Sequence, residues 1–183
     1  MGQRSRVSIA PRSTRQVSDG SAEAAIKARV IEAEVEFFHQ PFIKSLQISS
    51  GAITQITEAR ARVRVRVDGR ESWGRGSIYL SDLWAWPDPT LAHEMRDEVL
   101  RRMCGEISSR LPELVGGEEH HPLELGMRLH DSLSRLDPPN VPALARAMCA
   151  SPFDAAIHDA VGLALGPCAF DLYSEPLETP SAD

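Results

Sequence analysis

Two stretches in the first half of the chain alternate between apolar and charged residues. Ile31, Ala33, Val35 and Phe37 alternate with three glutamates, and residues 59–67 alternate alanine or valine with four arginines. A period of two is typical of a strand with one buried face. We therefore predict strands over residues 29–38 and 59–67. After the turn-forming pair Asp68-Gly69, we predict a third strand over residues 70–79.

The charges predict how the strands pair. Glu32, Glu34 and Glu36 have the spacing needed to lie opposite the arginines of residues 60–66. Each exposed pair contributes only about 0.2–1 kcal/mol, but a slip of one residue would bury the arginines, so the charges select the register. A phosphate- or nucleic-acid-binding arginine face is the alternative. We do not favour it, because the neighbouring acidic strand would neutralise that face.

Two connecting segments are rich in large side chains. Residues 39–51 are predicted to form a loop, and residues 77–89 an irregular segment that contains Tyr79, Trp84 and Trp86. Two explanations stay open for the tryptophans. They either close the end of the sheet or form an apolar lip that faces a ligand or partner.

The second half of the chain has helical periodicity. Apolar residues recur at four-residue spacing from Leu91 to Ile107, which predicts a helix over residues 90–110 that ends before Pro112. Further helices are predicted over residues 122–136, 141–150 and 151–166. Ser151 and Pro152 are predicted to start the last of these, and Gly166 to end it. Its alanine-rich face would let a neighbour approach closely. Strands followed by helices predict an α+β fold: a three-stranded antiparallel meander followed by a helical bundle packed on one face.

Composition narrows the classes of function. The chain has 183 residues, a net charge of −6 and 42% hydrophobic residues. These values suit one domain with its own core and argue against nucleic acid or an anionic membrane as a partner. Residues 1–24 are predicted to be a disordered tail. The three cysteines form no close pair in the sequence, which favours reduced thiols and a cytoplasmic protein.

Motifs that would indicate catalysis are weak. His120 and His121 follow two glutamates, but adjacent side chains converge poorly on one ion, so a polar loop is the better interpretation. Asp154 and His158 have the spacing of an ion pair on one helix. The sequence contains no phosphate-binding loop, dinucleotide fingerprint or nucleophile elbow. Its only lysines are Lys27 and Lys44.

Two motifs carry a resemblance to a known family. The sequence Asp68-Gly69-Arg70-Glu71-Ser72-Trp73-Gly74 is similar to the "DG…GWG" hairpin in the N-terminal domain of the enolase superfamily. Residues 151–162, followed by Phe170-Asp171-Leu172-Tyr173, resemble the last helix of that domain in the mandelate racemase and muconate lactonizing enzyme branch. The resemblance covers residues 25–173. Two residues depart from the family's pattern. Arg75 stands where the family often has Glu, and Leu163 stands where it usually has Lys.

The resemblance implies a capping domain over residues 25–175, with residues 176–183 as a tail or the start of an absent barrel domain. In that family the barrel carries the catalytic lysines and the carboxylates that bind Mg²⁺. The enzymes remove a proton next to a carboxylate group of the substrate, and they include racemases, cycloisomerases and dehydratases. The chain would then be truncated before its barrel and inactive alone, so its status as an enzyme stays open.

The resemblance also implies partners and site residues. The partners would be a catalytic barrel and a small carboxylate substrate. A homo-oligomer is also compatible with the resemblance. No cofactor is expected in this chain, and Mg²⁺ is implied for a full-length member. Two capping loops would line the pocket with His39, Phe42, Lys44, Tyr79, Trp84 and Trp86. The alternative from another class is a stand-alone α+β binding protein that contacts a partner through its Trp84/Trp86 loop.

Overall fold

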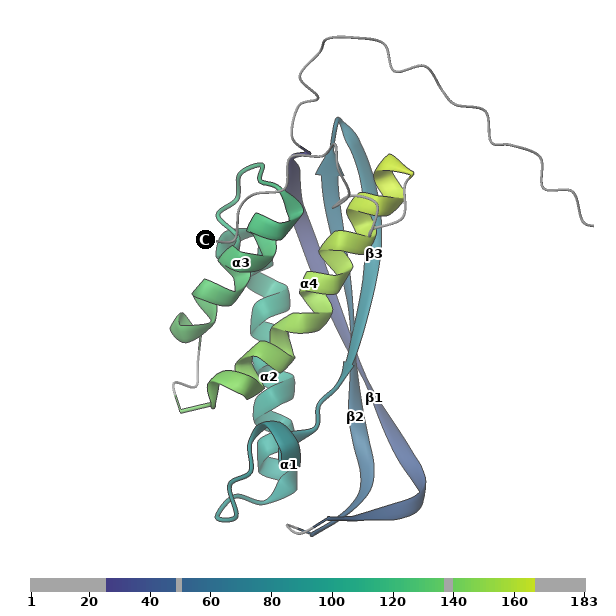
Figure 1. The fold of residues 1–183 in the computed structure, drawn as a ribbon, viewed down its shortest axis with the longest axis vertical. Helices are drawn as coiled ribbons and strands as arrows, with labels where there is room; N and C mark the ends of the chain where they lie inside the picture. The colour runs from purple at the N-terminus through teal and green to yellow at the C-terminus, as the bar shows by residue number, and fades with distance from the viewer. Residues whose placement is uncertain (1–25, 49–50, 137–139, 167–183) are drawn as a thin grey trace, which may run out of the picture.

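A computed structural model describes residues 26–48, 51–136 and 140–166 (Figure 1). These residues form one three-stranded sheet and a set of helices that follow it in the chain, which confirms the predicted α+β class. The elements are β1 (Ala28–Ile48), β2 (Gly51–Val67), β3 (Arg70–Tyr79), α1 (Asp82–Ala85), α2 (His93–Leu114), α3 (Pro122–Ser132), the 3₁₀ helix η1 (Leu133–Arg135) and α4 (Ala143–Leu165). The predicted tail over residues 1–24, and residues 176–183, lie outside the described residues.

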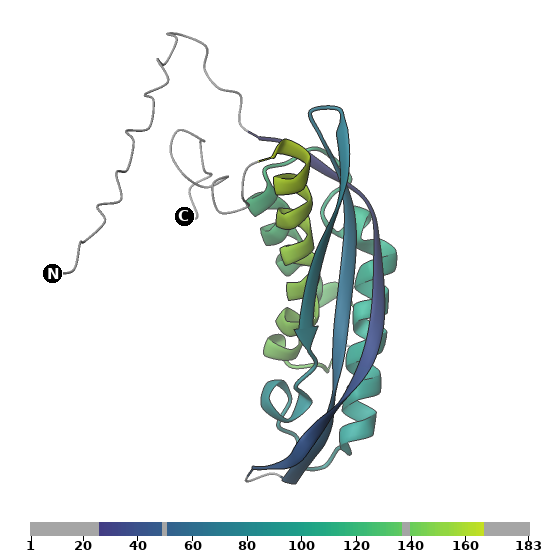
Figure 2. The same cartoon turned by 90° about the vertical axis from the view of Figure 1, so that its right-hand side faces the viewer.

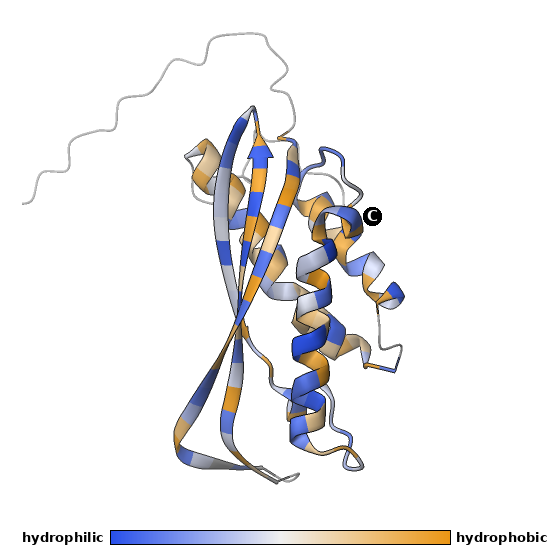
Figure 3. Cartoon of the chain, turned by 180° about the vertical axis from the view of Figure 1, so that it is seen from behind, coloured by the Kyte–Doolittle hydropathy of each residue, from blue (hydrophilic) through white to orange (hydrophobic). Residues whose placement is uncertain are grey.

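The sheet is the predicted antiparallel meander in the order β1-β2-β3. Glu32, Glu34 and Glu36 lie opposite Arg64, Arg62 and Arg60 respectively, as the alternation of charges predicted. Ion pairs join Arg64 to Glu32 at 2.7 Å and Arg62 to Glu34 at 3.2 Å. The alanines and valines of β2 between residues 59 and 67 face the opposite side and are buried. Figure 3 shows the resulting hydrophilic and hydrophobic bands along the strands.

A bulge in β1 keeps its apolar side chains on the buried face. The register shifts between Val30 and Glu32, and Ile31 is the extra residue. Ala28 and Val30 precede the bulge at even positions, whereas Ala33 and Val35 follow it at odd positions. Because successive side chains of a strand point to opposite faces, only the extra residue lets both sets pack against β2 on the same side.

The predicted loop over residues 39–51 is wrong in part. β1 continues to Ile48 and β2 begins at Gly51, so the two strands form a ribbon that extends past the end of β3. Most of the described side chains in residues 39–48 and 51–56 are exposed, so the stretch does not alternate between a buried and an exposed face. Cross-strand backbone pairing holds it instead, from His39 opposite Thr57 to Pro41 opposite Gln55, and again from Leu46 opposite Ile53.

The helices cover one face of the sheet. α4 packs on β3 and β2, and α2 packs along β1. Figure 2 shows the three strands with α4 alongside β3 and α2 behind β1. The apolar core lies between these two layers, as predicted for helices packed on one side.

The alanine-rich face of α4 packs on two glycines of β3. A Cβ atom on Gly74 would lie 2.1 Å from the carbonyl oxygen of Ala156, and one on Gly76 would lie 2.1 Å from that of Pro152. Real Cβ atoms essentially never come this close, so only glycine fits at both positions. The partner of this helix face is therefore the chain's own sheet.

The boundary predicted at Ser151 is wrong, because α4 runs unbroken from Ala143 through Pro152. Proline has no N–H to donate to the carbonyl of Met148, four residues earlier. The hydroxyl of Ser151 donates to that carbonyl oxygen instead, at 2.9 Å. Ser151 thus compensates for Pro152 inside the helix rather than starting a new one. Gly166 ends the helix with a φ of 95°, as predicted.

The boundaries of α2 and α3 also differ from the prediction. α2 begins at His93 and includes Pro112, which the prediction placed beyond its end. Its buried stripe runs through Leu100, Cys104 and Leu111, whereas Met95 is exposed. Met103 and Ile107 of the predicted face are buried as well, so the predicted face is correct in the C-terminal half of α2 and wrong at Met95. α3 ends at Ser132, and a 3₁₀ turn follows it over Leu133–Arg135.

Candidate functional site

Two segments that are separate in sequence reach the same end of the molecule. One is the far part of the β1–β2 ribbon, and the other is the chain from the end of β3 through α1 (Figures 1 and 2). The register links them, because Glu58 of β2 lies between Phe38 of β1 and Tyr79 of β3. The amide of Leu80 also donates to the carbonyl of Thr57 at 2.8 Å. We call residues 38–45 together with residues 79–86 the tip.

A large irregularity in β1 shapes the first half of the tip. Pro41 pairs with Gln55 and Leu46 pairs with Ile53, so residues 42–45 of β1 face the single residue Thr54. Such an irregularity redirects side chains away from the pleat. Phe42 and Lys44 are exposed here, and Ile43 is exposed over its whole side chain. His39 lies just before it, with Nδ1 at 3.4 Å from the hydroxyl oxygen of Thr57.

The two tryptophans of the second half of the tip lie in different environments. Trp84 is 67% exposed on α1, and Tyr79 is 53% exposed at the end of β3. Trp86 is only 9% exposed and belongs to the apolar core. Each of the two explanations left open by the sequence thus fits one tryptophan. Trp86 closes the end of the core, and Trp84 points away from it.

A buried charged cluster fixes the second half of the tip on α2. Arg96 Nε donates to Asp82 Oδ2 at 2.8 Å, and His93 Nδ1 lies 2.9 Å from Asp82 Oδ1. Both Arg96 and Asp82 are only 3% exposed. A buried ion pair requires close geometry and further hydrogen bonds to offset the loss of hydration. Sequence reasoning missed this cluster, although Arg96 precedes Leu100 by one helical turn on the buried stripe of α2.

Backbone carbonyls complete the hydrogen bonding of Arg96. Its Nη1 donates to the carbonyl of Asp88 at 2.7 Å and to that of Leu91. The Asp88 carboxylate accepts from the Thr90 hydroxyl and amide at 2.6 and 2.8 Å, and these bonds lower the pKa of Asp88. The segment that carries Trp84 is therefore held at several points.

The other sequence candidates have structural roles. His121 is buried at the start of α3, where its Nδ1 accepts from the amide of Leu123 at 3.2 Å. Burial, and secondarily the nearby His158, lower the pKa of His121. His120 Nδ1 lies 3.0 Å from Glu124, and His158 Nε2 lies 3.5 Å from Asp154. Among the described residues, no three His, Cys, Asp or Glu side chains are arranged to hold a metal ion.

The described cysteines and helices add two observations. Cys104 and Cys149 are buried free thiols between α2 and α4, and a hydrogen bond with Cys149 together with burial raises the pKa of Cys104. Cys168 lies outside the described residues. None of the described helices combines the length and apolar character that a membrane span needs.

Comparison with known proteins gives structural similarity without sequence similarity. No family model and no curated protein matches the sequence. Solved structures of the enolase superfamily match over most of this chain. One is an enolase from Bradyrhizobium complexed with magnesium and mandelic acid, which is 18% identical, with a TM-score of 0.48 over 80% of this chain and 34% of that one.

Two further matches have the same character. A mandelate racemase/muconate lactonizing enzyme-like protein from Rubrobacter xylanophilus is 16% identical, with a TM-score of 0.44 over 78% of this chain and 33% of its own. L-talarate/galactarate dehydratase from Salmonella typhimurium LT2, liganded with Mg and L-lyxarohydroxamate, is 14% identical. The match covers 87% of this chain and 36% of the dehydratase, with a TM-score of 0.41. The chain thus spans about a third of the length of the enolase-superfamily structures that it resembles.

Proposed function

We propose that this chain is the N-terminal capping domain of a mandelate racemase/muconate lactonizing enzyme-like protein. The observation that carries the proposal is the tip: the bulged residues 42–45 and the Trp84 segment reach one end of a meander-plus-helix fold. The hairpin and helix motifs of the sequence support the same assignment. In the resembled family, two segments at these places close over the mouth of a barrel.

The tip has the character of a surface that covers a small substrate. Phe42, Tyr79 and Trp84 offer apolar and aromatic area, and Lys44 and His39 add polar groups. Ligand pockets are lined mainly by apolar and aromatic side chains with a few polar groups that set orientation. We propose that Lys44 faces the carboxylate side of a small acid substrate and that Trp84 shields it from water.

We further propose that catalysis requires a barrel domain, which would supply the lysines and the Mg²⁺ ligands. The described residues offer no set of three metal-binding side chains that fits Mg²⁺, so no step is assigned to a metal in this chain. The chain's own part is to bind, orient and exclude water at the tip.

The coding DNA on both sides of codons 1–183, read in every frame, tests this proposal. We expect a barrel-coding sequence with a Lys-x-Lys motif and spaced Asp/Glu ligands, either joined to this chain or next to it. The absence of such a sequence on either side would refute the capping-domain proposal.

A stand-alone binding protein is the second candidate function, and the exposure of Trp84 is the observation that favours it. Trp86 is packed in the core, so Trp84 alone of the pair would contact the partner. A stable monomer that binds a partner through Trp84, with no barrel encoded nearby, would support this candidate.

A further inference from the structure

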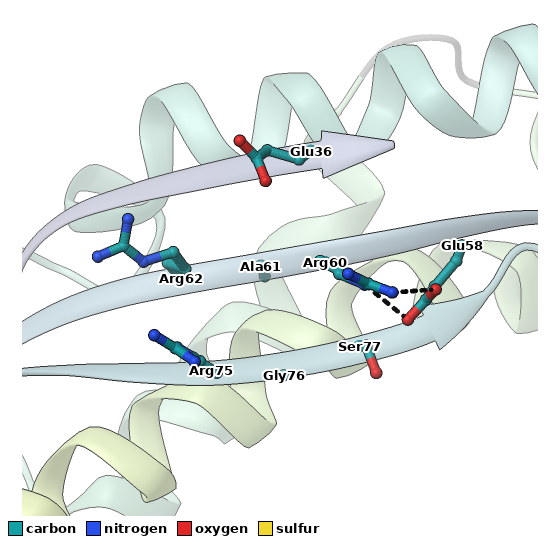
Figure 4. Close-up of a pocket in the computed structure, with 8 residues that line it drawn as sticks. All are labelled: Glu36, Glu58, Arg60, Ala61, Arg62, Arg75, Gly76 and Ser77. Carbon is teal, nitrogen blue, oxygen red and sulfur yellow. Dashed lines mark hydrogen bonds and ion pairs between the residues drawn. The ribbon is translucent and has the colours of Figure 1, made fainter. Parts of the chain in front are cut away.

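The open face of the sheet contains a groove that the proposed function does not use. It is about 660 Å³ in volume and lies across the middle of the three strands. It is lined by Glu36, Glu58, Arg60, Ala61, Arg62, Arg75, Gly76 and Ser77 (Figure 4). We call it the arginine groove.

The strand register places two arginines opposite each other in the groove. Arg62 of β2 faces Arg75 of β3, and Arg60 faces Ser77 one pair further along. Like charges directly opposite each other destabilise a sheet, and such side chains start only about 4.5–5.5 Å apart at Cβ. Figure 4 shows the two guanidinium groups together at one end of the groove, away from the Glu58–Arg60 pair.

The three arginines differ in how their charge is balanced. Glu58 binds Arg60 through two hydrogen bonds of 2.9 Å, and Glu34 lies 3.2 Å from Arg62. In the described part of the chain, Arg75 has no carboxylate at ion-pair distance from its side chain. The groove lining contains three arginines and two glutamates, so it has one more cation than anion. Outside the lining, Glu34 pairs with Arg62, and the Asp159 carboxylate accepts from the Arg75 amide.

The groove is held rigidly. The guanidinium of Arg62 lies 4.7 Å from the centre of the Trp73 ring, which fixes its direction. The amide of Arg75 donates to Asp159 of α4 at 2.9 Å, which fixes β3 at this residue. On the covered face of the sheet, Gly76 lies against the backbone of α4, which fixes β3 beneath the groove. A prearranged site loses less free energy on binding a ligand than a mobile one.

We propose that the arginine groove binds a small oxyanion, a phosphate or carboxylate group, between the guanidinium groups of Arg62 and Arg75. The planar guanidinium fork matches the geometry of both groups. The bound anion neutralises the excess cation and removes the repulsion across the strands. Glu36 lies on the opposite wall and opposes binding, so its charge weakens the affinity.

Titration of the full chain with inorganic phosphate, and separately with malonate, tests this proposal. Backbone amide shifts are followed by NMR at an ionic strength held constant with sodium chloride. We expect saturable shifts at residues 60–62 and 75–77, with a Kd of about 1 mM for the better anion. The tighter of the two anions identifies the group that the groove prefers.

Three variants separate a built site from general screening. Arg75→Gln should weaken binding about tenfold, because it removes a charge-assisted hydrogen bond. Arg66→Gln removes the same charge from the same face outside the groove and should leave the Kd unchanged, whereas Glu36→Gln should tighten binding. Absence of saturable shifts with both anions, or equal weakening by Arg75→Gln and Arg66→Gln, would overturn the proposal. The unliganded spectrum of each variant reports whether it is folded.

Discussion

At the scale of single residues, the most specific fit is between a glycine and a helix backbone. Nothing in the sequence distinguishes Gly74 from a glycine that only loosens a strand. The structure shows that its missing Cβ leaves room for the backbone of Ala156 and Ala160. The alanines of α4 predicted a close approach, but the surface that approaches them depends on how strands and helices pack.

Gly74→Ala should destabilise the protein by about 3 kcal/mol. The new Cβ would meet backbone atoms at 2.1 and 2.3 Å, which cannot move as a flexible side chain can. Gly105→Ala is the matched control, because nothing lies within 4 Å of its added Cβ in the middle of α2. It should stabilise by about 0.5–1 kcal/mol through helix propensity. Urea unfolding measures both, and equal effects would contradict the account.

His121 makes stability depend on pH. Its pKa in the folded protein is lowered by burial, so the unfolded chain binds more protons on this group below its ordinary pKa of about 6.5. The free energy of unfolding should therefore fall as the pH decreases through that value. Protonation also removes the Nδ1 acceptor of the Leu123 amide.

His121→Asn should flatten this pH dependence, because asparagine also accepts an amide hydrogen bond at a helix start but does not titrate. His130→Asn, the same substitution at an exposed position, is the control. Urea unfolding at several pH values above and below 6.5 measures the slopes. A slope retained in His121→Asn would show that other groups cause it.

At the scale of elements, the alternating patterns predicted the three strands and their register. The ribbon beyond Phe38 was missed because backbone pairing, rather than burial, holds it. The continuity of α4 was missed because Pro152 normally marks a helix start, and the bond from Ser151 to Met148 becomes evident only in the folded helix. The charged cluster at Asp82 was not predicted, because Asp82 and Arg96 are 14 positions apart in the sequence. The only indication of it in the sequence is an arginine on the apolar stripe of α2.

Ser151→Ala should cost about 1 kcal/mol in the natural sequence, because the carbonyl of Met148 loses its donor. The same change should cost much less in a Pro152→Ala background, where residue 152 regains an N–H for that carbonyl. A double-mutant cycle of unfolding free energies measures the difference. Equal costs in both backgrounds would mean that the hydroxyl does not replace the missing helix bond.

Arg96→Met should destabilise the protein by about 3 kcal/mol, because it leaves Asp82 buried without its cation. The substitution should also release the segment that carries Trp84 and Trp86. Tryptophan emission should then move to longer wavelength, because Trp86 becomes exposed to solvent. Arg110→Met breaks two partly exposed pairs, with Glu106 and Glu113 on the same helix, and should cost at most about 1 kcal/mol. An unchanged emission spectrum in Arg96→Met would contradict the anchoring role.

At the scale of the whole molecule, the order of strands and helices predicted the layers correctly. The sequence predicted two capping loops, over residues 39–51 and 77–87, and parts of both lie in the tip; their role in a site stays a prediction. It did not predict that Trp86 turns into the core while Trp84 turns outward, because both residues belong to one short segment and only packing against α2 and α4 distinguishes them. The central claim is that the tip covers the mouth of a catalytic barrel.

Photo-crosslinking from the tip tests that claim most directly. A benzophenone amino acid replaces Trp84 in the chain expressed in its own cells, and the exposed Met127 of α3 serves as the control position. The account predicts that position 84, but not position 127, crosslinks to peptides of a barrel domain near its Asp/Glu metal ligands. Crosslinks from position 84 only to an unrelated protein or to a second copy of this chain would contradict it.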